Sequence, residues 1–97
     1  MPKSSLAEQP ANPSETGYKR AMDVMHESMS KMKYSGNADV DFVRGMIHHH
    51  QAAIDMAKIE LVHGKDPEIR KLAEDIISAQ EKEIDLMEAW LKANAPK

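Results

Sequence analysis

Apolar residues recur at spacings of three and four from Tyr18 to Leu91, which is the period of one face of an α-helix. An all-β sandwich or barrel leans on aromatic strands and glycine turns, but aromatic residues make up 4% of this chain and glycines number 4. Its 97 residues allow one modest core. The sequence therefore predicts a single all-α domain.

Capping signals divide the pattern into three helices. The first begins after Ser14 and ends before Gly36, and Asn37 or Asp39 caps a second helix over residues 40–63. Gly64 stands where a left-handed C-terminal cap belongs, and Asp66 followed by Pro67 starts a third helix over 67–93. Because both connections are short, we predict an antiparallel three-helix bundle, which we expect dimerisation to complete.

The first fourteen residues differ from the rest of the chain. They are polar, contain three prolines and show no apolar period, so we predict a disordered tail over 1–14 and one helical domain over 15–95. No apolar stretch marks a secretory signal, so the chain is either cytosolic or a mature form, and we expect no membrane insertion. A net charge of -3 provides no basic field, which disfavours nucleic acid as a partner.

Methionine and histidine are abundant and cysteine is absent, with counts of 8, 5 and 0. Thioethers and imidazoles are soft and borderline metal ligands, whereas the lack of thiols excludes disulfide scaffolds, zinc ribbons and thiol catalysis. If the first turn centres near Asn37, His26 lies beside His48 and Met25 beside His49. If the second turn centres near Lys65, His49 lies level with residues 79–81, so one layer gathers these donors.

The position of each residue around its helix shows which candidate ligands in that layer share a face. Met46 shares a face with His49 and His50, at spacings of three and four, while His48 points almost opposite and is predicted to be solvent-exposed. Two polar residues on the core face of the third helix would orient the imidazoles as hydrogen-bond partners. The predicted metal ligands are Met22, Met25, His26, Met29, Met46, His49 and His50, and the predicted supporting residues are Gln80 and Glu83.

Three alternatives to a metal site of this kind are open. The inward histidines could form a hydrogen-bonded core layer with Gln80 and Glu83 that binds no metal. The methionine-rich face could bind an amphipathic partner helix, which would make the protein an interaction module. Glu60-x-x-His63 has the spacing of di-iron bundles, and a di-metal oxidase is the third alternative. Glu60 lies about 15 Å along the helix from the layer of His26, at 1.5 Å per residue, which disfavours it.

The donor types select among metals. Calcium and magnesium need clustered oxygen ligands, and the acidic residues are spread over solvent faces. Thioethers with imidazoles suit Cu(I), Ag(I) should follow it, and a site dominated by imidazole also accepts Cu(II). A thiol-free site survives oxidation, which favours the periplasm or the cell exterior.

The helical part of the chain contains Asp41-Phe42, Met46-Ile47, His49-His50-Gln51, Ala53-Ile54, Met56-Ala57, Asp66-Pro67-Glu68, Leu72-Ala73, Ile76-Ile77, Ala79-Gln80, Glu83-Ile84, Met87 and Trp90-Leu91, with Met22, Met25-His26 and Met29 upstream. Over about Met22 to Leu91 these residues resemble the bacterial domain of unknown function (DUF) family 305. The resemblance implies a ferritin-like helical fold that is usually exported, with some members binding copper in the periplasm and supporting copper resistance. Because three helices give a thin core, we expect dimerisation to complete a four-helix or larger bundle. We therefore expect a periplasmic copper-binding homodimer that is not an enzyme and that passes copper to a periplasmic partner.

Overall fold

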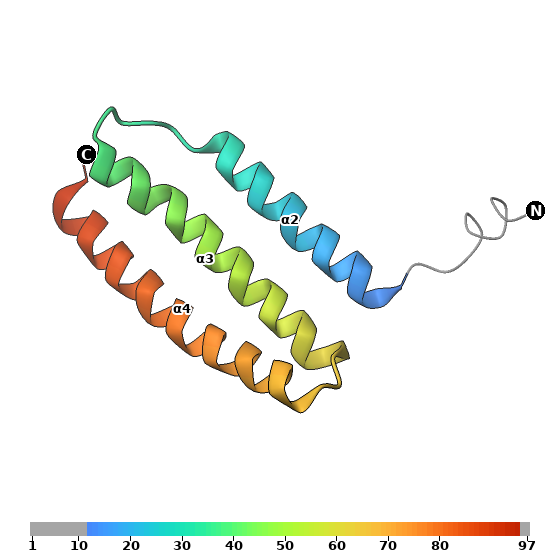
Figure 1. The fold of residues 1–97 in the computed structure, drawn as a ribbon. Helices are drawn as coiled ribbons and strands as arrows, with labels where there is room; N and C mark the ends of the chain where they lie inside the picture. Colours follow the sequence, from blue (N-terminus) through green and yellow to red (C-terminus); the bar gives the residue numbers. More distant parts are fainter. Residues whose placement is uncertain (1–11, 96–97) are drawn as a thin grey trace, which may run out of the picture.

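The computed structural model describes residues 12–95, which form three α-helices joined by short turns (Figure 1). They are α2 (Pro13–Lys31), α3 (Ala38–His63) and α4 (Pro67–Asn94). Consecutive helices run antiparallel (Figure 1). The predicted all-α class and the helix order are confirmed over this range.

Side-chain caps set the helix starts. The Asn12 side chain accepts hydrogen bonds from the backbone N–H groups of Ser14 and Glu15, so α2 begins at Pro13. The predicted boundary at residue 15 is therefore wrong for the last residues of the expected tail, and the rest of that tail, residues 1–11, lies outside the described range. Asn37 caps α3 and Asp66 caps α4, as the sequence indicates.

The turns differ from the prediction in one respect. Gly64 has a φ of -73°, so it is not a left-handed cap, and its N–H donates to the Glu60 carbonyl. Gly36, in the turn before α3, adopts a φ of 87° instead. The Asp41 carboxylate stabilises that turn by accepting hydrogen bonds from the Ser35 amide, the Ser35 hydroxyl and the Gly36 amide, which lower the pKa of Asp41.

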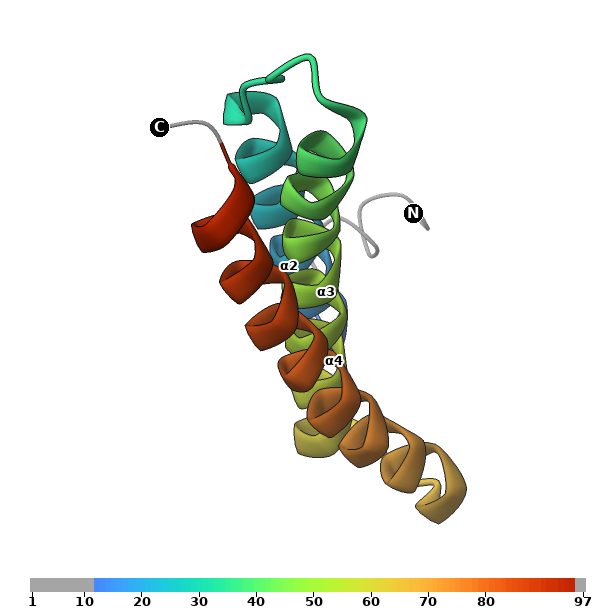
Figure 2. The ribbon, with the colours of Figure 1, turned by 90° about the vertical axis from the view of Figure 1, so that its left-hand side faces the viewer.

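The three helices lie in a single layer with α3 in the middle (Figures 1 and 2). Within the described residues α3 contacts both neighbours, whereas no Cα atom of α2 comes within 8 Å of one in α4. The smallest extent of the molecule is 15 Å. Most of the buried apolar residues are accordingly small: Ala21, Val40, Ala52, Ile54, Ala57 and Ala73.

Small residues let α2 approach α3 closely. A Cβ placed on Gly17 would lie 3.1 Å from the Cδ1 atom of Ile59, whereas one placed on Gly45 would meet the Cε atom of Met29 at 3.8 Å. The first distance is tighter than an ordinary van der Waals contact and the second is ordinary. The seam between α2 and α3 is therefore fully packed at Gly17 and has room for a methyl group at Gly45.

Alanine substitutions at the two glycines should have different effects on stability. Gly45→Ala is expected to stabilise the protein by about 0.5–1 kcal/mol, because alanine loses less backbone entropy in a helix. At Gly17→Ala the same gain is offset by overpacking against Ile59, so we expect no gain or a loss. Urea unfolding of both variants measures the difference. An equal gain at both positions would contradict the close approach of α2 at Ile59.

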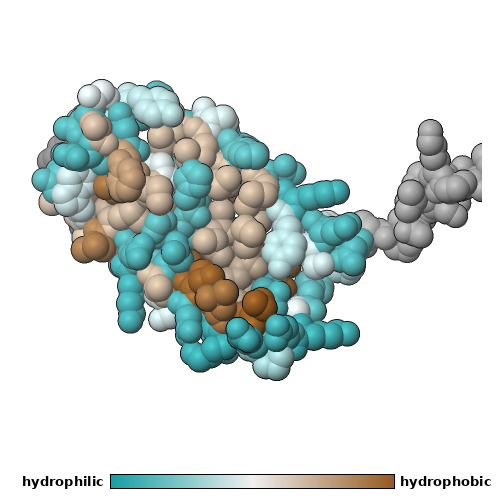
Figure 3. All heavy atoms as spheres, in the orientation of Figure 1, coloured by the Kyte–Doolittle hydropathy of each residue, from teal (hydrophilic) through white to brown (hydrophobic). Residues whose placement is uncertain are grey.

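One broad side of the layer is apolar. Figure 3 shows a band of apolar side chains over the middle of this side, with hydrophilic residues along its borders. We name it the open face and define it by Phe42, Met46, His49, Ala53 and Met56 on α3 with Ile69, Leu72, Ile76, Glu83 and Leu86 on α4. Two grooves hollow it, of about 360 Å³ and about 460 Å³. The opposite side of α3 carries polar residues such as Gln51 and Lys58.

Candidate metal centre

His50 is held between α3 and α4 by a carboxylate. Its side chain is 11% exposed, and its Nε2 atom lies 2.5 Å from Oε1 of Glu83, which is itself 56% exposed. The predicted support of an imidazole by Glu83 is therefore seen in the geometry. Carboxylates that accept a hydrogen bond from one imidazole nitrogen fix the ring and leave the other nitrogen as the donor to a metal.

The second ring nitrogen of His50, Nδ1, has no hydrogen-bond partner within residues 12–95. It retains contact with solvent, because no buried side-chain nitrogen or oxygen in that range lacks a partner. With the Nε2 proton donated to Glu83, the lone pair for a metal lies on Nδ1. His50 thus has one oriented nitrogen and one available nitrogen.

Thioethers from α2 reach α3 one turn before the histidines. The Cε atoms of Met29 and Met32 approach the position of a Cβ on Gly45 to 3.8 and 4.0 Å. Gly45 precedes Met46 in the sequence, and Met46 is half-buried. The structure therefore brings the thioethers of Met29, on α2, and Met32, at the C-cap of α2, to the part of α3 that holds Met46. Met32 was not predicted as a ligand, although it continues the spacing of Met22, Met25 and Met29.

The expected partners of Met25 and His48 are corrected by the packing. Met25 shares a small cavity of about 30 Å³ with His48 between α2 and α3, so His48 is half-buried and not the solvent-exposed residue that was predicted. α2 packs on the side of α3 that carries Gly45 and Ala52, and His48 lies on that side. His49, one residue on, is rotated by about 100° and is exposed on the open face.

The remaining predicted residues spread over different sides. His26 is exposed on α2, and Met22 is half-buried there. Gln80 is half-buried and makes no side-chain hydrogen bond within the described range, so Glu83 and not Gln80 supports the imidazole. In residues 12–95 no group of three or more His, Asp or Glu side chains could hold a metal ion. The predicted histidines His26, His49 and His50 therefore do not converge in one chain.

The two segments that could form a di-metal site lie at different levels of the helical layer. Glu60 and His63 lie at the C-terminal end of α3, and that end packs beside the start of α2, since Gly17 meets Ile59. His26 lies further along α2, away from that contact. The two Glu-x-x-His-like segments are thus at different levels, as the sequence indicates.

Comparison with known proteins places the chain in a family. The family described as "Domain of unknown function (DUF305)" matches residues 2–91. The chain belongs to the DUF305 family. The resemblance noted from Met22 to Leu91 is confirmed, and the DUF305 match extends further toward the N-terminus. The description of DUF305 assigns no activity.

An uncharacterized protein of Acanthamoeba polyphaga mimivirus is similar to this DUF305 chain. The two are 45% identical over 53 residues, which is 55% of this chain and 35% of the viral protein. The matched segment thus spans about a third of the length of the viral relative. None of the described helices is both long enough and apolar enough to cross a membrane.

The donors that are present suit a soft cation. Without three clustered imidazoles and carboxylates, a metal held by the described part of one chain needs thioether sulfur, which α2 supplies beside the histidine run of α3. Thioether and imidazole together favour Cu(I) over calcium, magnesium or a di-iron pair. The residues therefore fit the predicted ion in chemistry, with fewer histidines per site than predicted.

Proposed function

We propose that this DUF305 protein binds copper, foremost Cu(I), and sequesters or carries it without catalysing a reaction. The observation that carries the proposal is the packing of the α2 methionines over Gly45, beside Met46 and within two turns of His49 and His50. Ag(I), also a soft ion, should bind in the same way, and Cu(II) should prefer the imidazoles. Copper is cargo in this proposal.

His50 and the methionines would have separate tasks. His50 offers Nδ1 while Glu83 holds its ring through Nε2, so the imidazole loses little freedom when it binds the ion. The thioethers of Met29 and Met46 supply soft ligands that carry no charge. A site of neutral ligands favours the monovalent ion, because it does not compensate the second charge of a divalent one.

The proposed compartment is the periplasm or another exported location, where copper resistance would be the physiological role and a periplasmic copper-transfer protein the partner. The support is chemical: the chain has 0 Cys, and thioether ligands form no disulfides in an oxidising compartment. We also propose a homodimer, in which a second copy covers the open face of the helical layer. Its support is the exposure of the open face, where Phe42 is 65% and Leu86 is 71% exposed.

A competition titration tests copper binding. The purified protein is added to a chromogenic Cu(I) chelate under anaerobic reducing conditions, and we expect bleaching of the chelate as protein takes the ion. An unchanged chelate spectrum at several equivalents of protein would refute the proposal.

The interaction-module alternative is favoured by one observation, the apolar groove of about 360 Å³ in the open face. Thermal unfolding separates the two functions. If copper binds the folded state, a hundredfold excess over Kd adds about 2.7 kcal/mol, which should raise Tm by roughly 10 °C or more for a domain of this size. A Tm unchanged by Cu(I) would favour the module. A di-metal oxidase would instead show an oxygen-dependent absorption change after metal loading.

A further inference from the structure

α3 and α4 each carry apolar residues at heptad spacing that contact no other helix of the single layer. On α4, one stripe packs against α3 and includes Ala73, Ile77, Ile84 and Leu91, which are buried or half-buried. A second stripe, at spacings of three and four, lies on the open face: Ile69, Leu72, Ile76, Ala79, Glu83 and Leu86. Its residues Leu72 and Leu86 are 52% and 71% exposed. The second stripe therefore has no facing helix in the described chain.

The middle helix, α3, also carries an apolar stripe with no facing helix in the described residues. Phe42, Met46, His49, Ala53 and Met56 follow one another on α3 at spacings of four and three, on the same open face. Apolar residues repeated in this way insert between the side chains of a facing helix in coiled-coil packing. Two adjacent stripes of this kind predict two facing helices.

Each stripe contains one polar position. On α3 it is His49, with Phe42 seven residues before it and Met56 seven residues after it. On α4 it is Glu83, which reaches the neighbouring His50. A polar residue within an apolar stripe fixes the register of helix pairing, because any other register buries it against apolar side chains. The open face is thus apolar on both sides of one polar layer.

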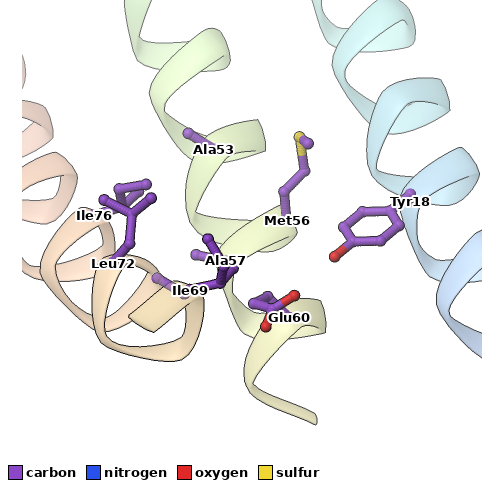
Figure 4. Close-up of a pocket in the computed structure, with 9 residues that line it drawn as sticks. Tyr18, Ala53, Met56, Ala57, Glu60, Ile69, Leu72 and Ile76 are labelled. Carbon is purple, nitrogen blue, oxygen red and sulfur yellow. The ribbon is translucent and has the colours of Figure 1, made fainter. Parts of the chain in front are cut away.

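Each apolar half of the open face is hollowed by a groove. Toward the end that holds Trp90, the exposed side chains of Phe42 and Leu86 line the groove of about 460 Å³. Toward the other end lies the groove of about 360 Å³, with Tyr18 of α2 at one side and Leu72 and Ile76 of α4 at the other (Figure 4). Exposed apolar side chains that line one groove can enter the groove at the other end if the same surface is turned around.

We propose that a second copy of this chain covers the open face by an antiparallel two-fold arrangement with its axis at the layer of His49 and Glu83. Phe42 and Leu86 of each copy then lie toward the groove of the other. The inference rests on the proposed homodimer and specifies its geometry. It also brings the His49 residues of both copies to one layer, so the metal site that includes His49 is incomplete in a single copy.

The size of the face is sufficient for such a dimer. The 28 residues of α4 span about 42 Å, and α3 and α4 side by side cover about 20 Å, which gives roughly 800 Å². A stable interface buries about 800 Å² on each partner. A two-fold interface also needs a self-complementary surface, which the polar layer with a groove and exposed apolar side chains at each end provides.

Distances between spin labels test the arrangement. The chain has 0 Cys, so Gln51→Cys and Lys58→Cys each provide one labelling site, and both lie on the polar side of α3 away from the interface. An axis between His49 and His50 separates the two labels along the helix by about 5 Å at position 51 and about 26 Å at position 58. Pulsed electron resonance on the metal-free protein should therefore give a clearly longer distance for Lys58→Cys. Equal distances at both sites would mean parallel pairing and would overturn the proposed geometry.

Paired substitutions test the interface itself. Leu72→Glu with Leu86→Glu should convert the dimer to a monomer in light scattering, with helicity unchanged in circular dichroism because both side chains are exposed in the single layer. Val62→Glu is the matched control, since Val62 is 75% exposed on the opposite side of α3. A monomeric metal-free wild type, or a dimer that survives the double substitution, would overturn the inference. The copper titration of the wild-type protein is a separate measurement, so failure of copper binding is distinguished from failure of the dimer.

Discussion

The His49→Ala/His50→Ala double variant should lose the ability to compete for Cu(I) with a chromogenic chelator, with an affinity lower by roughly 100-fold or more. These residues supply the predicted nitrogen donors that follow Met46 on α3, and the His50 ring is already fixed by Glu83. The measurement is the competition titration of the two proteins side by side.

His63→Ala is the matched control for that variant. His63 is exposed at the C-terminal end of α3, beyond the level of the α2 methionines. Its replacement by alanine should therefore leave the Cu(I) affinity unchanged. The double variant should keep its helicity, because His49 is exposed and Glu83, whose side chain is already 56% exposed beside His50, stays in contact with water when the imidazole is removed. Equal affinity in the double variant and the wild type would exclude these imidazoles as ligands.

Replacing thioethers by leucine should remove copper affinity without removing the fold. Met22→Leu with Met29→Leu preserves side-chain volume closely, so each change should cost less than about 1.5 kcal/mol in stability. Leucine offers no lone pair, and we expect Cu(I) affinity to fall by at least about tenfold while Cu(II), which prefers imidazole, is held nearly as well. Chelator competition measures the affinities for Cu(I) and Cu(II), and thermal unfolding measures the stability.

Met56→Leu controls for the general effect of replacing methionine. Met56 lies on the open face about two turns beyond His49 and lines the apolar groove. It should therefore leave Cu(I) affinity unchanged. If Met56→Leu lowers the affinity as much as the double variant, the ligands lie in the groove and not beside Met46.

The starts of α3 and α4 were predictable from local signals, whereas the Asn12 cap of α2 was missed. The side chains of Asn37 and Asp66 cap the helices that follow them, and Pro67 occupies a first-turn position that needs no N–H donor. The end of α3 was less predictable. Gly64 tolerates a left-handed conformation, but tolerance does not require it, and the chain leaves the helix there in an extended conformation.

The faces of α3 were only partly predictable. Its large apolar residues predict one packing surface, but α2 packs on the small residues Gly45 and Ala52, where the backbones can approach. This placed His48 between the helices and His49 on the surface. The relation of Glu83 to His50 followed from periodicity together with the antiparallel turn, whereas the position of Gln80 depended on a register that the turn length alone does not determine.

The position of α3 between two helices that do not contact each other has a consequence for folding. All packing between helices joins segments that follow directly in sequence, so the contact order is low and folding of the single layer should be fast. The hairpin of α3 and α4 contains the more extensive of the two helix pairings and both members of the His50–Glu83 pair. During synthesis, however, α2 and α3 emerge first, so the thioether side of the layer can assemble before the carboxylate that orients His50 has left the ribosome.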